Sequence, residues 1–216
     1  MKKIFLSLVA FTCIAGIADA QKVTFAVSAG VANANTFVKD DSLKVAGIGA
    51  KNGFTGGVSA TIPFSKLFNF QPAVNFVQKG CKNEKDKSSL TLNYIEVPLL
   101  LVFKTRNKDD GDKKADDFFF GIGPTVAFCT AGEYKYKTDS GTVTGKVKFG
   151  NNRYNDDLRR VDVGANIMMG CLFFNNFFFS ANYNIGFMDL SPAKKFRYRN
   201  NYLGFKVGYS FSNGKK

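Results

Sequence analysis

The stretch Tyr202-Leu203-Gly204-Phe205-Lys206-Val207-Gly208-Tyr209-Ser210-Phe211 decides the fold of this 216-residue chain. Every second residue, beginning with Leu203, is large and apolar, whereas the residues between them are small or polar. Successive side chains of a β-strand point to opposite faces, so this stretch predicts a strand with one apolar face and one polar face. A sheet of such strands can form either a soluble sandwich or a membrane barrel, and the two differ in what surrounds the apolar face.

The N-terminus has the three parts of a secretory signal peptide. Two lysines at the start are followed by a short apolar run over residues 4–17 and then by an Ala-Asp-Ala segment. Cleavage is expected between Ala20 and Gln21. The run is too short for a transmembrane helix, which needs about 20 apolar residues. We therefore expect residues 1–20 to be removed and residues 21–216 to form one exported domain.

The composition excludes much catalytic chemistry. The chain contains no histidine, so it cannot build a Ser-His-Asp triad, a Cys-His pair or a histidine metal site. An enzyme is thus the least favoured class, and no cofactor or metal is expected. The cysteines that follow the signal segment, Cys81, Cys129 and Cys171, fit neither zinc nor C-x-x-C spacing. In an oxidising compartment, Cys81 and Cys129 are candidates for a disulfide, and Cys171 is expected to face lipid.

Alternating segments predict eight strands. In chain order they cover residues 23–31, 54–62, 68–77, 93–103, 118–128, 160–173, 177–187 and 202–211. Short connections at 63–67 and 175–176 alternate with long ones at 34–53, 78–92, 129–159 and 188–201. This alternation is typical of outer-membrane barrels, and an even strand number puts both termini on the periplasmic side. The charged connection 104–117 is longer than the pattern predicts.

The polar face of each predicted strand has the character of a barrel interior. Glycines such as Gly164 and Gly204 recur on it, and small residues suit a narrow interior with bent strands. Glu96, Asp162 and Lys206 also lie on this face, where they avoid a lipid exposure that costs a lysine about 2–4 kcal/mol. We therefore predict an all-β, eight-stranded antiparallel up-and-down transmembrane barrel. A secreted β-sandwich explains the alternation equally well, but not the loop pattern or the glycines.

Four segments carry a family resemblance. They are Gly-Phe-Thr-Gly-Gly-Val at 53–58, Phe-Gln-Pro-Ala-Val-Asn-Phe at 70–76, Leu-Asn-Tyr-Ile-Glu-Val-Pro-Leu-Leu at 92–100 and Phe-Gly-Ile-Gly-Pro at 120–124. Together they resemble the PorT-like outer-membrane β-barrel family of Bacteroidota. The resemblance implies an eight-stranded barrel in the outer membrane and implies no catalytic residues. It does not imply one activity, and the member that gives the family its name is linked to protein secretion and gliding.

Charged residues on the polar rows provide the candidate interior site. We predict that Glu96, Arg160, Asp162 and Lys206 form a cluster inside the barrel. An eight-stranded interior is about wide enough to be filled by its own side chains, and buried charges pair with one another. The cluster is therefore expected to be a salt-bridge plug, and the alternative is a narrow path for ions.

The long connections are rich in basic residues. These are Lys79, Lys82, Lys85, Lys87, Lys135, Lys137, Lys146, Lys148, Arg153, Lys194, Lys195, Arg197 and Arg199. Such charge attracts the phosphates of lipopolysaccharide or an acidic envelope protein, although ordinary solvated loop charge explains it equally well. Nucleic acid is not an expected partner of an exported chain.

Three functions remain open at this point. The first is a non-enzymatic outer-membrane barrel with a structural or interaction role in the envelope, which could include a role as an accessory to secretion. The second is a narrow porin-like channel for ions or small solutes. The third is a secreted soluble barrel that binds an apolar ligand.

Overall fold

The computed structural model describes residues 23–40, 48–83, 87–105, 117–138, 141–173, 175–192 and 196–211. The predicted signal peptide, with its cleavage site between Ala20 and Gln21, lies outside the described residues. The same is true of three of the predicted loop lysines, Lys85, Lys194 and Lys195. Within the described ranges, no helix is long and apolar enough to cross a membrane.

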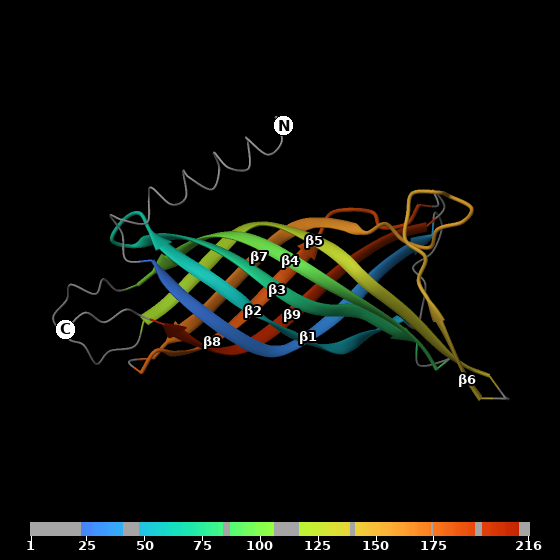
Figure 1. Ribbon diagram of the computed structural model, residues 1–216, viewed down its shortest axis with the longest axis horizontal. Helices are drawn as coiled ribbons and strands as arrows, with labels where there is room; N and C mark the ends of the chain where they lie inside the picture. Colours follow the sequence, from blue (N-terminus) through green and yellow to red (C-terminus); the bar gives the residue numbers. More distant parts are fainter. Residues whose placement is uncertain are drawn as a thin grey trace, which may run out of the picture.

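The described chain forms one antiparallel sheet of nine strands (Figure 1). They are β1 (Thr24–Asp40), β2 (Ile48–Pro63), β3 (Phe68–Asn83), β4 (Ser88–Lys104), β5 (Asp117–Thr138), β6 (Gly141–Lys146), β7 (Val161–Leu172), β8 (Phe177–Gly186) and β9 (Phe196–Phe211). Eight of these strands close into a ring, because β9 pairs with β1 and β4 pairs with β5. The predicted eight-stranded antiparallel barrel is confirmed. The ninth strand, β6, was not predicted, and it pairs with β5 alone among the described strands.

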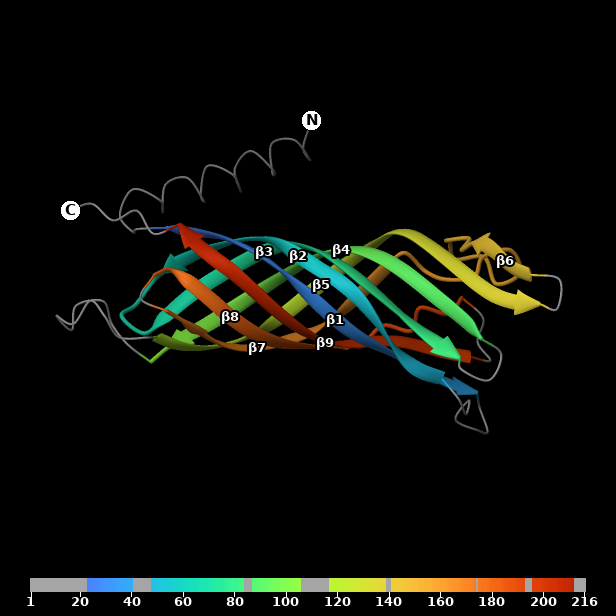
Figure 2. The ribbon, with the colours of Figure 1, turned by 90° about the horizontal axis from the view of Figure 1, so that it is seen from below.

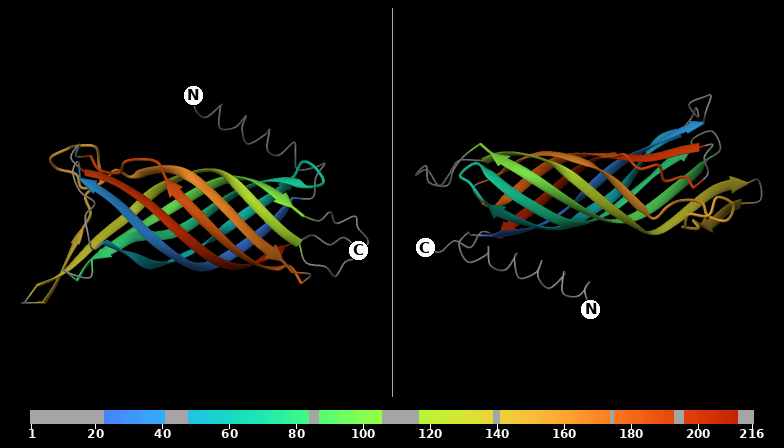
Figure 3. Two further views of the ribbon diagram at one scale, coloured as in Figure 1. Left: turned by 180° about the vertical axis from the view of Figure 1, so that it is seen from behind. Right: turned by 90° about the horizontal axis from the view of Figure 1, so that it is seen from above.

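The two ends of the barrel differ in their connections. The described chain starts and finishes at one end, together with the turns at 64–67 and 175–176 (Figures 2 and 3). We name this end the turn end. The opposite end carries the projecting β5–β6 hairpin and the segment 147–160, and we name it the hairpin end.

The strands extend further than the sequence pattern predicts. The ladder between β3 and β4 continues to Asn83 opposite Ser88, although a long loop was expected at 78–92. The ladder between β5 and β6 likewise fills part of the loop expected at 129–159. Ladder bonds use backbone N–H and C=O groups, so pairing persists after the side chains have become polar. The predicted long loops are therefore much shorter in the structure.

The two faces of the barrel wall have the predicted orientation. On the outer surface, Tyr183 and Phe205 are each 41% exposed, whereas Gly164 and Gly204 are buried inside. The outward apolar side chains form a continuous band that we name the apolar belt. It includes Phe25, Val27, Val31, Phe54, Val58, Val74, Ile95, Val97, Leu99, Leu101, Phe120, Ile122, Val126, Phe128, Val163, Met169, Phe179, Tyr183, Leu203, Phe205 and Val207.

Glycine allows close approach at the seam where β1 meets β9. A Cβ atom at Gly30 would lie 1.9 Å from the carbonyl oxygen of Phe205. Any larger residue would push the two strands apart, so glycine at this position follows from closure of the ring.

Candidate functional site

The barrel interior holds a cluster of buried charges centred on Lys79. The ammonium nitrogen of Lys79 lies 2.9 Å from Glu96 Oε2 and 3.8 Å from Asp162 Oδ2. It also lies 4.9 Å from the ring centre of Tyr94 and 5.0 Å from that of Tyr202. All five residues are at most 2% exposed. We name them the interior charge cluster. Two carboxylates and two aromatic faces thus stabilise one cation away from water.

Hydrogen bonds connect this cluster across the barrel. The Tyr202 hydroxyl on β9 donates to Glu96 Oε1 on β4 at 2.6 Å. The Asn200 side-chain amide on β9 donates to the Tyr94 hydroxyl at 3.2 Å. Each pair is separated by 106 residues in the chain. The cluster therefore braces strands that are distant in sequence and are not direct neighbours in the ring.

Three of the four residues predicted for the interior lie there. Glu96 and Asp162 meet at Lys79, and Lys206 lies on the inner face of β9 within electrostatic reach of Glu96. Glu96 and Asp162 are nearly isolated from solvent, whereas Lys206 is half-buried. Their interior position is predictable from sequence, because the two-residue period continues through the core of each strand.

Arg160 is the exception, and its predicted place in the cluster needs correction. Its guanidinium carbon lies 4.9 Å from the ring centre of Phe149 and 5.9 Å from that of Phe128, and the side chain is exposed. Its Nη1 donates to the carbonyl of Cys129 at 3.3 Å. Arg160 immediately precedes β7, so it lies at the rim. There the guanidinium can stack on aromatic rings without leaving water, and burial would cost it more.

Lys79 is the central residue that the sequence did not reveal. The sequence pattern predicts a basic loop at this position, but Lys79 is 1% exposed and lies on β3. The inward row of β3 continues from Asn75 through Val77 to Lys79. Extending the alternation by two residues beyond the predicted strand end identifies it. Two buried carboxylates also require a nearby cation, which is a second reason to expect a basic residue in the interior.

An apolar layer covers the interior charge cluster on the side of the hairpin end. It packs Val147, Leu158 and Leu190 from the segments outside the ring against side chains of β4 and β5. Backbone bonds hold these segments in place, because Arg159 N–H donates to the Leu190 carbonyl at 2.8 Å and Val147 N–H donates to Gly132 at 3.0 Å. We name the layer the apolar plug. Its members are Leu92, Tyr94, Ala127, Cys129, Val147, Leu158 and Leu190.

The turn end of the interior combines polar and apolar side chains. A small cavity of about 50 Å³ is lined by groups that include Ser59, Gln71 and Lys104. Nearer the middle, Thr55 Oγ1 and Thr125 Oγ1 are buried without a hydrogen-bond partner among the described residues. Buried polar groups of this kind are commonly satisfied by internal water.

The candidate disulfide between Cys81 and Cys129 is not formed in the structure. Cys81 is half-buried, Cys129 is buried, and both are free thiols in the structure. The Cys129 thiol donates to the carbonyl of Ala131 at 3.4 Å. Cys171 lines an apolar groove of about 520 Å³ on the outer wall near the turn end, beside Phe179. Over the described ranges, no group of His, Cys, Asp or Glu side chains is arranged to hold a metal ion.

A closed eight-stranded antiparallel barrel with an apolar outer belt and a charged interior defines the class of small outer-membrane β-barrel proteins. The model of the family described as "Outer membrane protein beta-barrel domain" matches residues 19–191. The chain belongs to this family, and it is a small β-barrel protein of the bacterial outer membrane.

Solved structures with a similar chain path share little sequence with this protein. OprG from Pseudomonas aeruginosa is 15% identical, over 88% of this chain and 97% of that one, with a TM-score of 0.49. Neisserial surface protein A is 14% identical over 86% and 96%, with a TM-score of 0.44. Ail of Yersinia pestis, in complex with the heparin analogue sucrose octasulfate, is 16% identical over 88% and 99%, with a TM-score of 0.41. No curated protein sequence matches the chain.

Proposed function

We propose that this protein is a non-enzymatic barrel with a structural or interaction role in the cell envelope, and that its interior does not conduct. The observation that carries the proposal is the blocked interior. Lys79, Glu96 and two tyrosines fill the middle of the barrel, and the apolar plug covers them toward the hairpin end. An ion crossing this interior would have to displace a buried salt bridge and an apolar layer.

Conductance across a planar bilayer tests this proposal. The refolded protein is expected to give no discrete current steps, whereas a channel-forming porin measured in the same way does. The variant Tyr94→Ala, which removes a ring shared by the cluster and the plug, serves as a check that an opened interior is detectable. Steady unit currents from the unmodified protein would contradict the proposal.

A narrow channel for ions or small solutes is the second candidate. The unpartnered hydroxyls of Thr55 and Thr125 favour it, because a file of water molecules would satisfy them. A conducting path past the cluster would be sensitive to its charge. The channel hypothesis therefore predicts that Glu96→Gln changes both the size and the cation selectivity of the current steps.

We propose further that the turn end faces the periplasm and that the hairpin end faces the cell exterior, so both termini are periplasmic. Two of the three connections at the turn end, at 64–67 and 175–176, are tight, and the hairpin end carries the β5–β6 hairpin and the segment 147–160, which supports this orientation. The connection between Lys104 and Asp117 at the turn end is the long exception. An epitope inserted between β5 and β6 is expected to be detected on intact cells. The same epitope inserted beside Lys66, in the turn 64–67, is expected to be detected only after the outer membrane is permeabilised.

The β5–β6 hairpin is the best candidate surface for an envelope partner. The rings of Tyr134 and Tyr136 stack with their centres 6.2 Å apart. Each of these residues is 40% exposed, and Val143 is 41% exposed. The opposite face of the hairpin carries Lys135 and Lys137. Together with the PorT-like resemblance, this two-sided hairpin supports an accessory role in secretion. Replacing both tyrosines with serine should then reduce secretion without changing the amount of folded barrel.

We propose in addition that basic side chains at the hairpin end contact lipopolysaccharide phosphates. Lys137, Lys146, Lys148, Arg153 and Arg197 are all exposed there. Binding to such phosphates should weaken as salt is added, because exposed charges are screened.

A further inference from the structure

The outer surface of strands β1 to β4 changes from apolar to polar to cationic along the barrel axis. The apolar belt reaches Phe54 on this side, and a row of side-chain amides follows it toward the hairpin end. In that row, Asn33 donates to Asn52 Oδ1 at 2.6 Å, and Gln78 donates to Asn93 Oδ1 at 3.2 Å. Amides pair readily with esters, amides and sugars, which are the groups that link lipid chains to their head groups.

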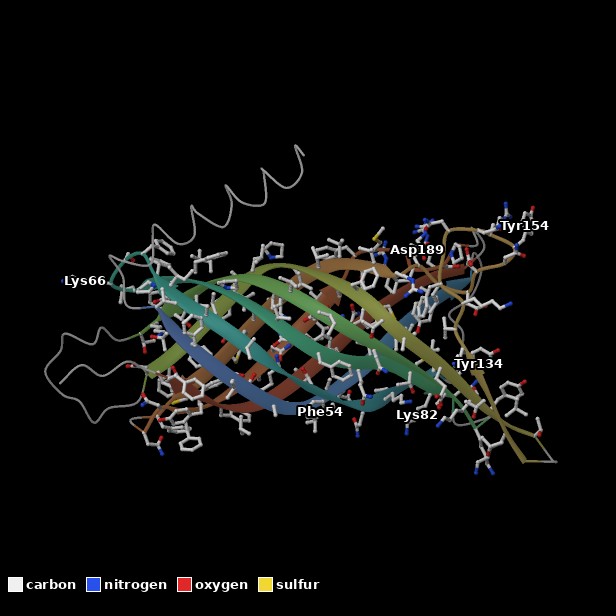
Figure 4. The ribbon with its side chains drawn as sticks, in the orientation of Figure 1. Phe54, Lys66, Lys82, Tyr134, Tyr154 and Asp189 are labelled. Carbon is white, nitrogen blue, oxygen red and sulfur yellow. The ribbon has the colours of Figure 1, made fainter. Side chains whose placement is uncertain are left out.

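A row of residues beyond the amides carries the first lysines. Strand register places Gly49, Lys82, Ser89, Lys135 and Thr144 opposite one another across β2 to β6. They share the outer face, and Lys82 and Lys135 are exposed. The Lys82 side chain extends along Gly49, because a Cβ added there would meet its Cε at 3.6 Å. Figure 4 shows Lys82 on the same side of the barrel as Phe54, but nearer the hairpin end.

The adjacent row adds two more cations and one anion. Thr91 is opposite Glu133, and Glu133 is opposite Lys146. The Lys51 ammonium donates to Thr91 Oγ1, and Lys135 pairs with Glu133 at 2.9 Å. That ion pair is exposed on both sides and is therefore weak. Glu133 thus offsets only part of the surrounding positive charge.

We name five side chains of this outer face the lysine patch: Lys51, Lys82, Lys135, Lys137 and Lys146. Lys137 lies opposite Thr142 in the next row of the hairpin. Among the side chains placed in these three rows, Glu133 is the one acidic residue, so their net charge is five minus one, or +4. A patch with this net positive charge creates a local electrostatic potential that attracts anions.

We propose that the lysine patch binds the phosphate groups of a lipid whose acyl chains lie against the apolar belt beside it. The proposal rests on the proposed orientation, in which the hairpin end faces outward. The order of layers on the protein, which is apolar, then amide, then cationic, matches the order of acyl chain, linkage and phosphate in such a lipid. A free phosphate ion needs only the last layer, so the continuous surface favours the lipid as the occupant.

Binding to nanodiscs of defined composition tests the proposal with the whole mature chain. The unmodified protein is reconstituted in phosphatidylcholine, and bis-phosphorylated lipid A is titrated in and followed by native mass spectrometry. A phosphate-free form of the same lipid provides one arm, and inorganic phosphate as a competitor provides another. The test variant is Lys51→Gln/Lys82→Gln/Lys135→Gln. The matched control is Lys66→Gln at the turn end, which is exposed in the structure.

The expected loss of affinity is about fivefold for each lysine and about a hundredfold for the triple variant. The Lys66→Gln control should change affinity less than about twofold, and arginine variants at the three patch positions should retain it. Glu133→Gln should tighten binding, because it removes the anion of the patch. Heat-modifiable migration on gels establishes that each variant is folded before its binding is measured.

Several results would overturn the site. These are equal binding of the phosphate-free lipid, an equal loss in the Lys66→Gln control, or full competition by inorganic phosphate at the lipid's own concentration. If the proposed orientation is wrong but the lipid site is real, the experiments give a different combination of results. In that case lipid binding in nanodiscs still depends on the lysine patch, while an epitope in the β5–β6 hairpin stays inaccessible on intact cells.

Discussion

Lys79 Nζ lies 2.9 Å from Glu96 Oε2 in the middle of the barrel, and neither side chain is exposed to solvent. A buried ion pair contributes little net stability compared with a well-packed apolar pair, because both charges lose their hydration. Removing one partner is different, since it leaves an uncompensated charge. The pair therefore constrains which substitutions the interior can tolerate.

Lys79→Met should lower the free energy of unfolding by about 3–5 kcal/mol. The substitution keeps most of the side-chain volume but leaves Glu96 and Asp162 without their shared cation. Urea titration in detergent, followed by heat-modifiable gel migration, measures the effect. Lys66→Met in an exposed turn is the control, with an expected change within about 0.5 kcal/mol. Equal stability of the two variants would show that the interior cluster is not paired as described.

Tyr202→Phe should cost about 1–3 kcal/mol of stability. The Tyr202 hydroxyl donates to Glu96 at 2.6 Å, and its removal leaves a buried carboxylate oxygen without that donor. Tyr183→Phe changes the same atom on the outer wall, where the residue is 41% exposed, and should be nearly neutral. The comparison uses the same unfolding titration, and a cost at Tyr183 as large as that at Tyr202 would contradict it.

Gly30→Val should prevent closure of the ring. The added Cβ would lie 1.9 Å from the Phe205 carbonyl oxygen at the seam between β1 and β9. We expect a loss of more than about 3 kcal/mol, visible as absence of the fast-migrating folded band on unboiled gels. Ala29→Val is the matched control, because Ala29 is adjacent but points outward. A normal folded band from Gly30→Val would mean that the seam is wider than the structure has it.

A charged substitution in the apolar belt should destabilise the barrel in a membrane, whereas the same substitution outside the belt should not. Leu99 lies midway along the outward row of β4 and is 41% exposed, and Val143 on β6 is also 41% exposed. Leu99→Arg should destabilise the barrel in lipid vesicles by about 2–4 kcal/mol, whereas Val143→Arg should change it little. Equal effects at these two equally exposed sites would indicate that lipid does not surround the belt.

The strand cores and their faces were predictable because a buried or lipid-facing wall fixes the two-residue period. The pattern from Leu203 to Phe211 gave the correct inner and outer rows of β9. Glu96 and Asp162 followed from the same alternation. The prediction was wrong at strand ends. There neither face of the strand has to be buried or to contact lipid, and the side chains are as polar as those of a loop.

Lys79 and Arg160 illustrate this limit, because one was predicted outside the barrel and lies inside it, and the other was predicted inside and lies at the rim. Lys79 lies near the start of a polar stretch that looks like a loop, yet it remains paired in the sheet and its side chain lies in the interior. Arg160 continues an inward row by sequence, but at the rim its long side chain turns to water and to Phe149. The strand β6 was missed because six residues with two glycines carry a weak pattern, and its pairing with β5 is a tertiary outcome.

The central claim, that the bulky row contacts lipid and the small row lines the interior, has a direct test at two adjacent residues of β8. Phe179 points outward and is 44% exposed, whereas Phe178 points inward and packs against Phe119 at 6.4 Å. The chain has no tryptophan, so Phe179→Trp and Phe178→Trp each report on a single site. In vesicles with brominated acyl chains, fluorescence of the Phe179→Trp variant should be strongly quenched and that of Phe178→Trp should be largely retained. Quenching of Phe178→Trp with Phe179→Trp left unquenched would contradict the account.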